Sequence, residues 1–152
     1  MADKWPQFWC DQPTAQVIAG KASGAIALGA PVIIAAAIGT DGLITFSTTT
    51  TLGDPATYGV YVGKPGGVAA AAADGDKILV CKRGRAKVKV DGSGTAIAAG
   101  NWLEADTTAG QAVKVTAPAA GVQKVVLCQA LQASTAAGDF ILTDVQPFYN
   151  SG

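Results

Sequence analysis

The sequence offers few residue types that could perform acid–base or nucleophilic chemistry. It contains no histidine, which removes the commonest general base and the commonest metal ligand together. A Ser or Cys nucleophile would therefore need a Lys or a carboxylate as its base, and no Ser-x-x-Lys pattern occurs. Glu104 is the single glutamate, which disfavours a pair of catalytic carboxylates. We predict that the chain is not an enzyme.

The remaining candidate ligands do not form a recognisable metal or cofactor motif. Cys10, Cys81 and Cys128 are odd in number and widely spaced, which fits neither a disulfide framework nor a zinc site. Asp74-Gly75-Asp76 has too few ligands for a calcium loop and is typical of a hydrogen-bonded turn. The segment 59–65 has a proline where a phosphate loop needs Ser or Thr. The sequence therefore predicts free thiols, no metal and no cofactor.

Positive charge is concentrated in one basic cluster. Five of the eleven cations lie close together in the sequence, namely Lys82, Arg83, Arg85, Lys87 and Lys89. The cluster fits a contact surface for an acidic partner, and it equally fits a solvated strand face that discourages edge-to-edge pairing. It contains no aromatic residue for base stacking, and the formal net charge of the chain is zero. We therefore expect no nucleic-acid partner.

Length and composition favour one domain that is covered by neighbouring subunits. The chain has 152 residues, enough for a single hydrophobic core, and only 14% of them are charged. The uncharged stretch 22–40 is interrupted by Gly and Pro, and the first 21 residues lack the basic start of a signal peptide. We therefore expect no membrane association. Because the cysteines are predicted to be free thiols, we expect the protein to assemble in a reducing cytoplasm.

Turn signals separate short runs that are rich in Val, Ile, Thr and aromatic residues. This spacing predicts an all-β fold, either a small single-domain barrel or a sandwich. Alternation is clearest at 85–90, where Arg85, Lys87 and Lys89 share one face of a strand. The Ala run 68–73, which ends at Asp74-Gly75, is the only helical candidate, so we expect at most one short helix.

Two pairs of segments resemble each other within the chain. Residues 25–32 are similar to 96–103, and residues 73–80 are similar to 136–143. Chance similarity between Ala-rich segments is one explanation. The other, which we favour, is that strand–turn–strand units are reused inside one barrel, because the offsets of the two pairs differ and exclude a solenoid.

The two ends differ from the strand-rich middle. Trp5, Phe8 and Trp9 lie beside prolines at 6 and 13, which argue against a helix or a central strand. We predict an extended arm at 1–14, a β-rich domain at 15–146 and a tail at 147–152. The aromatic arm could cover the domain's own core, but we expect it to dock on another chain.

Three segments together resemble a known family. They are 68–76 before a Val-rich strand, 91–106 from Asp-Gly-Ser-Gly to Asn-Trp-Leu-Glu-Ala-Asp, and 129–133 before Gly-Asp-Phe-Ile at 138–141. In a His-free chain rich in Ala, Gly and Thr, they resemble the head decoration, or capsid cement, proteins of tailed bacteriophages. The resemblance covers residues 15–146.

The resemblance implies a structural virion protein. Such proteins form homotrimers on the outer surface of the capsid and cement adjacent major capsid protein subunits after head expansion. The capsid-contact candidates are then Trp5, Phe8 and Trp9 of the arm, together with four residues of the basic cluster, Arg83, Arg85, Lys87 and Lys89. Deletion of 1–13 is expected to leave the domain folded and to weaken its attachment to capsids.

The alternative is a surface-displayed carbohydrate-binding or adhesive β module. Lectin sites commonly combine an exposed aromatic ring with Asp, Asn or Gln. The candidate residues for that function are Trp102, Asn101 and Asp106.

Overall fold

The computed structural model describes Cys10 and residues 15–152. Within these residues the chain forms nine β-strands and no helix. The strands are β1 (Gln16–Ala22), β2 (Pro31–Ala36), β3 (Ile44–Ser47), β4 (Thr57–Gly63), β5 (Lys77–Asp91), β6 (Trp102–Ala105), β7 (Ala112–Lys114), β8 (Gln123–Ala130) and β9 (Ala137–Ser151). The prediction of a small all-β domain is confirmed.

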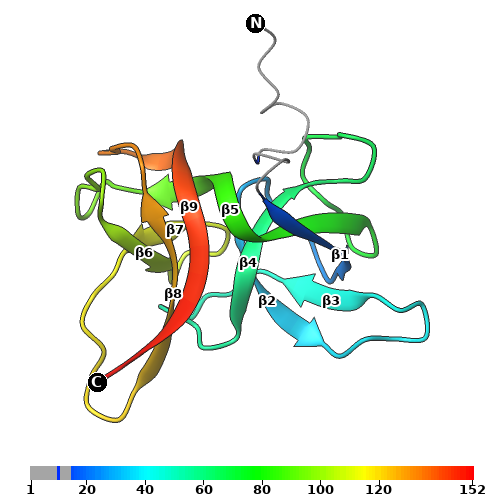
Figure 1. The fold of residues 1–152 in the computed structure, drawn as a ribbon, viewed down its shortest axis with the longest axis horizontal. Helices are drawn as coiled ribbons and strands as arrows, with labels where there is room; N and C mark the ends of the chain where they lie inside the picture. The colour runs from blue at the N-terminus through cyan, green and yellow to red at the C-terminus, as the bar shows by residue number, and fades with distance from the viewer. Residues whose placement is uncertain (1–9, 11–14) are drawn as a thin grey trace, which may run out of the picture.

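The strands close into two five-stranded rings that share β5. The first ring runs β1-β3-β2-β4-β5 and is closed by pairing of β1 with β5. The second runs β5-β7-β6-β8-β9 and is closed by pairing of β5 with β9. Figure 1 shows the two barrels side by side, with the green β5 passing from one into the other. Closure leaves few free sheet edges, which is how small barrels avoid edge-to-edge association.

The second barrel repeats the topology of the first, strand by strand. In each barrel the first strand pairs in parallel with the third, as β1 does with β3 and β5 with β7. The other pairings of each barrel are antiparallel. The last half of β5 therefore corresponds to β1. Strands β6, β7 and β8 correspond to β2, β3 and β4, respectively, and β9 corresponds to the first half of β5.

The internal sequence similarity has a structural counterpart. Ala30 donates its backbone N–H to Ala27 O at 3.1 Å. The equivalent residue, Asn101, lies 71 positions later in the aligned segments and donates its backbone N–H to Ala98 O at 3.1 Å. Preceding each turn is a buried isoleucine in an isolated bridge, Ile26 with Ala72 and Ile97 with Ser134. The reused units are real, but the expectation that they lie inside one barrel was wrong, because each copy builds its own barrel.

Strand β5 changes partners at its midpoint. Arg83 lies opposite Gln16 of β1, whereas Gly84 lies opposite Val145 of β9. Gly84 has a φ of +108°, and a Cβ added there would lie 2.7 Å from the Cα of Ala15. Only glycine allows both this backbone conformation and the close approach of the chain at the junction.

Each barrel has its own core, and the two cores meet across β4 and β5. Phe46 and Tyr61 are the largest side chains of the first core. The second core gathers residues of β5, β6, β8 and β9, and it also includes Val60, Val62 and Cys81 from the side of the first barrel that faces it. The two barrels are therefore packed together as one unit.

Three segments differ from the expected organisation. Residues 68–73 form a loop rather than a helix, because Ala72 exchanges backbone hydrogen bonds with Ile26. A short Ala helix that packs against nothing is not stable enough to compete with this strand-like pairing. Residues 147–151, expected in a tail, continue β9 alongside β8. Cys10, expected in the arm, is buried in the second core and bridges to Ala86.

We predict that Gly84→Ala destabilises the protein by about 1–3 kcal/mol, because the new Cβ meets backbone and the residue must keep a positive φ. Urea unfolding followed by circular dichroism measures the change. Gly94→Ala is the matched control, since a Cβ there meets no heavy atom within 4 Å. Equal stability of the two variants would contradict the role assigned to Gly84.

Candidate functional site

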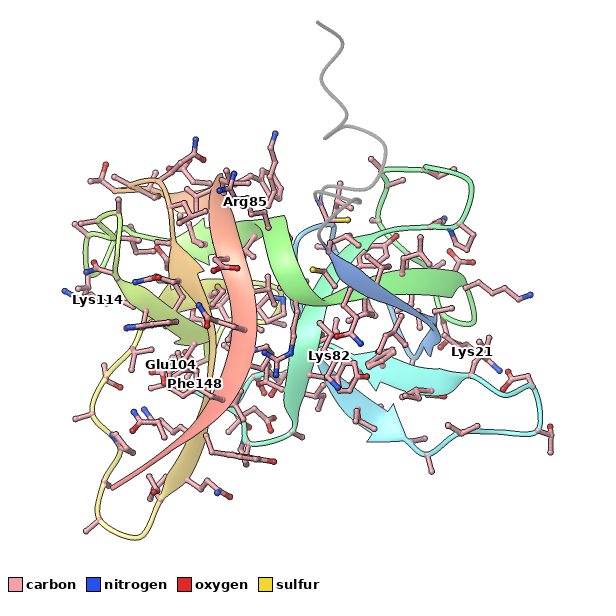
Figure 2. The ribbon with its side chains drawn as sticks, in the orientation of Figure 1. Lys21, Lys82, Arg85, Glu104, Lys114 and Phe148 are labelled. Carbon is pink, nitrogen blue, oxygen red and sulfur yellow. The ribbon has the colours of Figure 1, made fainter. Side chains whose placement is uncertain are left out.

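The structure divides the basic cluster into two parts. Lys82 lies over the ring of Tyr58 on β4, with Nζ 5.2 Å from the ring centroid. Figure 2 places Arg85 beside the upper end of β9 and Lys82 lower, near the first barrel. We call the other four residues, Arg83, Arg85, Lys87 and Lys89, the basic strip.

The basic strip lies along the exterior of β5. Ala86, Val88 and Val90 point into the second core, so the alternating Lys and Arg side chains point outward. Arg83 and Arg85 are exposed, and neither has a carboxylate oxygen within 4 Å among the described residues. Their charges are therefore available to an external partner.

One residue of the expected arm lies beside the basic strip. Trp5, Phe8 and Trp9 lie outside the described residues. Cys10, however, pairs with Ala86, which lies between Arg85 and Lys87 on β5. This proximity of Cys10 to the basic strip is not apparent from residues separated by some 75 positions in the sequence.

Exposed aromatic side chains lie on both faces of the last part of β9. Trp102 of β6 and Phe148 of β9 form an edge-to-face pair with centroids 5.2 Å apart. Tyr149, the next residue along β9, is 65% exposed. Sequence reasoning missed the connection because 148 and 149 were assigned to a tail. The pairing of β8 with the end of β9 fixes them on the domain surface.

The residues of the glycan-binding alternative are not assembled into one site. Asn101 Oδ1 accepts a hydrogen bond from Ala98 N at 2.9 Å and thereby closes its own turn. Asp106 is buried and accepts the backbone N–H of Thr107 at 2.7 Å. Both polar side chains beside Trp102 are therefore used within the fold.

All three cysteines are buried, and none forms a disulfide. Burial raises the pKa of Cys81 to about 12 and that of Cys128 to about 12, because a thiolate is poorly solvated in the core. Cys81 also donates its thiol hydrogen to Arg83 O at 3.3 Å. Thiols with such pKa values are not nucleophilic at neutral pH.

Glu104 forms a buried ion pair with Lys124, between β6 and β8. Its Oε1 lies 3.3 Å from Lys124 Nζ and accepts two hydrogen bonds from Thr116, one backbone and one side-chain, each at 3.2 Å. Its Oε2 is buried without a hydrogen-bond partner. Gly53, from the loop between β3 and β4, lies against this carboxylate.

The same glycine connects the two barrels through its main chain. Gly53 N donates to Ala105 O at 2.8 Å, and Gly53 O accepts from Val125 N at 3.0 Å. The loop of the first barrel is thus inserted between β6 and β8 of the second. The single glutamate therefore lies where the loop of the first barrel packs against the second.

Two further features bear on the function. Among residues 15–152 and Cys10, no helix is long and apolar enough to cross a bilayer. The same residues contain no group of three or more His, Cys, Asp or Glu side chains placed to hold a metal ion.

We predict that Lys124→Met destabilises the protein by about 3–5 kcal/mol, because it leaves the Glu104 carboxylate buried without a counter-ion. The double variant Lys124→Met/Glu104→Leu is expected to recover most of this loss. Denaturant unfolding measures both, with Lys114→Met on exposed β7 as the control. A double variant as unstable as the single one would contradict the assignment.

We also predict that the protein loses stability between about pH 9 and pH 12. In this window the unfolded chain releases thiol protons that the folded chain retains, so the free energy of unfolding falls as the pH rises. Each thiol contributes up to about 1.4 kcal/mol per pH unit. Urea unfolding over a pH series gives the free energy of unfolding at each pH. This free energy should fall less steeply with rising pH for Cys128→Ala than for the original chain. Identical slopes would exclude a contribution from Cys128.

Comparison with known proteins identifies a related fold. No protein-family model matches the chain. No curated protein sequence matches it either. Among solved structures, the chain is similar to the N base of the head fiber gp8.5 of bacteriophage phi29. The TM-score is 0.53 and the identity 17%, over 88% of this chain and 95% of that one. The resemblance to phage head proteins is therefore confirmed at the level of the fold.

Proposed function

We propose that this protein is a structural, non-enzymatic component of a phage virion that binds the outside of the capsid. The observation that carries the proposal is the fold shared with a phage head fiber base over 88% of the chain. The sequence resemblance to head decoration proteins supports the same assignment independently. We assign it the role of a cement protein that holds adjacent major capsid protein subunits together.

The arm and the basic strip form the capsid contact in this proposal. Cys10 pairs with Ala86, between Arg85 and Lys87, and it follows Trp9 directly in the sequence, which supports a shared contact of aromatic and cationic groups. Burial of one aromatic ring contributes about 1.5–3 kcal/mol, and unpaired arginines favour an acidic surface. An extended arm can also add a strand to an exposed sheet edge of the shell.

We further propose that the protein acts as a homotrimer. Only 14% of residues are charged, and Phe148 and Tyr149 are exposed on β9. A surface of this kind is normally covered by partner subunits. Three linked contacts would also strengthen attachment to the shell through avidity. Assembly in the host cytoplasm, before the virion leaves the cell, suits a chain with three free thiols.

Binding to purified expanded heads tests the proposal. Co-sedimentation is expected for the full chain, and deletion of 1–9 should weaken it at least about tenfold because the arm rings are lost. The deletion stops before Cys10 because that residue belongs to the core. Arg83→Glu/Arg85→Glu should weaken binding and reduce its salt dependence. Lys114→Glu, at the exposed end of β7 and apart from Arg85 in Figure 2, should not.

The same preparations give the oligomeric state by analytical ultracentrifugation. A trimer, in solution or on the shell, agrees with the proposal. A monomer that decorates heads without three-fold symmetry would contradict the trimer. If the chain lacking 1–9 decorated heads as tightly as the full chain, the arm would not be the anchor. Retention on immobilised glycans without binding to heads would instead support the adhesive alternative.

A further inference from the structure

The last part of β9 has a partner strand on one side. Strand β9 pairs with β5 as far as Val145 and with β8 as far as Ser151. Residues 146–151 therefore have β8 on one side, and no strand of the described chain pairs with their other side. Figure 1 shows this part of β9, in red, running beyond β5 to the C-terminus. We call residues 146–151 the β9 edge.

The backbone groups of Tyr149 point toward the open side of this edge. Tyr149 lies opposite Val125, and Val125 N donates to Gly53 O, away from β9. In an antiparallel pair, two opposite residues either exchange both of their hydrogen bonds or both face away from each other. The N–H and C=O groups of Tyr149 therefore point away from β8. By the same alternation Ser151 faces this side as well, and neither residue has a backbone partner there among the described residues.

The β9 edge lacks the charged side chains that commonly protect an exposed sheet edge. Unpaired N–H and C=O groups at an edge accept further strands unless Lys or other charged residues prevent it. Residues 146–151 are Gln-Pro-Phe-Tyr-Asn-Ser and carry no charge. Pro147 removes one N–H, but Tyr149 and Ser151 keep theirs. Phe148 is 42% exposed and Tyr149 is 65% exposed. An edge of this kind is suited to the addition of a strand.

The first barrel shows how the fold completes such an extension. Strand β5 continues past the first barrel in the same way, since its first half corresponds to β9. The extension of β5 is paired on both sides, with β9 on one side and with Cys10 and β7 on the other. Strands β7 and β9 belong to the next copy of the repeated unit. The β9 edge is therefore the equivalent contact, and the described chain holds no further unit to complete it.

An exposed and uncharged strand end lies on the first barrel. Strand β2 pairs with β4 as far as Ile33 but continues to Ala36. Residues 34–38 carry no charge, and Ile34 and Ile38 are 42% and 64% exposed. The loop after β6, which is the counterpart of β2, consists of 106–111 and contains no large apolar residue. The apolar end of β2 is therefore not required by the fold.

We propose that the β9 edge is a subunit contact, to which residues 34–38 of a second copy of this chain add as a strand. This inference rests on the proposed homotrimer and names its interface. The added strand pairs with the N–H and C=O groups of Tyr149 and Ser151, and no like charges meet because neither segment is charged. The two segments lie on different barrels, as Figure 1 shows, so the contact is head-to-tail, and such contacts close into rings.

Amide hydrogen exchange of the full chain tests the contact, with the oligomeric state of the same samples measured by analytical ultracentrifugation. The amides of Tyr149 and Ser151 are expected to exchange at least about tenfold more slowly in the trimer than in the dilute monomer. Amides within 34–38 are expected to slow as well.

Three variants separate the main chain from the side chains. Tyr149→Pro removes an N–H that β8 does not use, and it should raise the dissociation constant at least about tenfold. Tyr149→Phe keeps the N–H and is the matched control, which should associate like the original chain. Ile38→Lys places a charge on the other segment and should weaken association without unfolding an exposed position. Circular dichroism reports whether each variant is folded.

Failure of this contact and failure of the proposed function give different results. A trimer in which Tyr149 and Ser151 exchange as fast as in the monomer would overturn the contact and leave the trimer intact. Protection of the β9 edge without protection of 34–38 would overturn the pairing of these two segments. Protection that arises on heads without self-association would assign the edge to a capsid strand instead. A monomer that still decorates heads would overturn both the trimer and this contact, but not capsid binding.

Discussion

The architecture depends on the continuous main-chain pairing of β5. Its first half is hydrogen-bonded to β1 and β4, and its second half pairs with β9 and β7. Every other described strand is attached to β5 directly or through one neighbour. Buried backbone N–H and C=O groups must be paired, so β5 has to exchange one set of partner strands for the other without leaving such groups unpaired. Gly84 permits it, since its φ of +108° redirects the chain without a side-chain collision.

The second constraint is the small size of each barrel. A five-stranded barrel of about 70 residues buries too little apolar surface to be strongly stable alone. Here Val60, Val62 and Cys81, which point out of the first barrel, pack into the core of the neighbouring barrel. Gly53 adds two main-chain hydrogen bonds and covers the Glu104–Lys124 pair. Duplication of one unit around a shared strand thus converts two marginal cores into a single stable body.

The distribution of charge separates the surfaces of this body. Only 14% of the residues are charged. Four cations, Arg83, Arg85, Lys87 and Lys89, lie along the exterior of β5. The exposed rings of Phe148 and Tyr149 lie at the end of β9, on opposite faces of the strand. The cationic side chains and the exposed aromatic rings therefore lie on different parts of the molecule, as Arg85 and Phe148 do in Figure 2.

The sequence by itself determined the all-β class, the turn-separated strands and the exposed face of 85–89, because these follow from local residue preferences and from period-two alternation. It also indicated the internal duplication, since matching turns need matching Gly and Ala positions, as at Gly29 and Gly100. Only the tertiary structure decided that the copies form two barrels, that 147–151 belong to β9 and that Cys10 is a core residue. It also brought Cys10 beside the basic strip and Lys21 opposite Lys77. These outcomes depend on pairing between distant strands, whose register is set by closure of each barrel and by burial of both cores, and no local pattern encodes them.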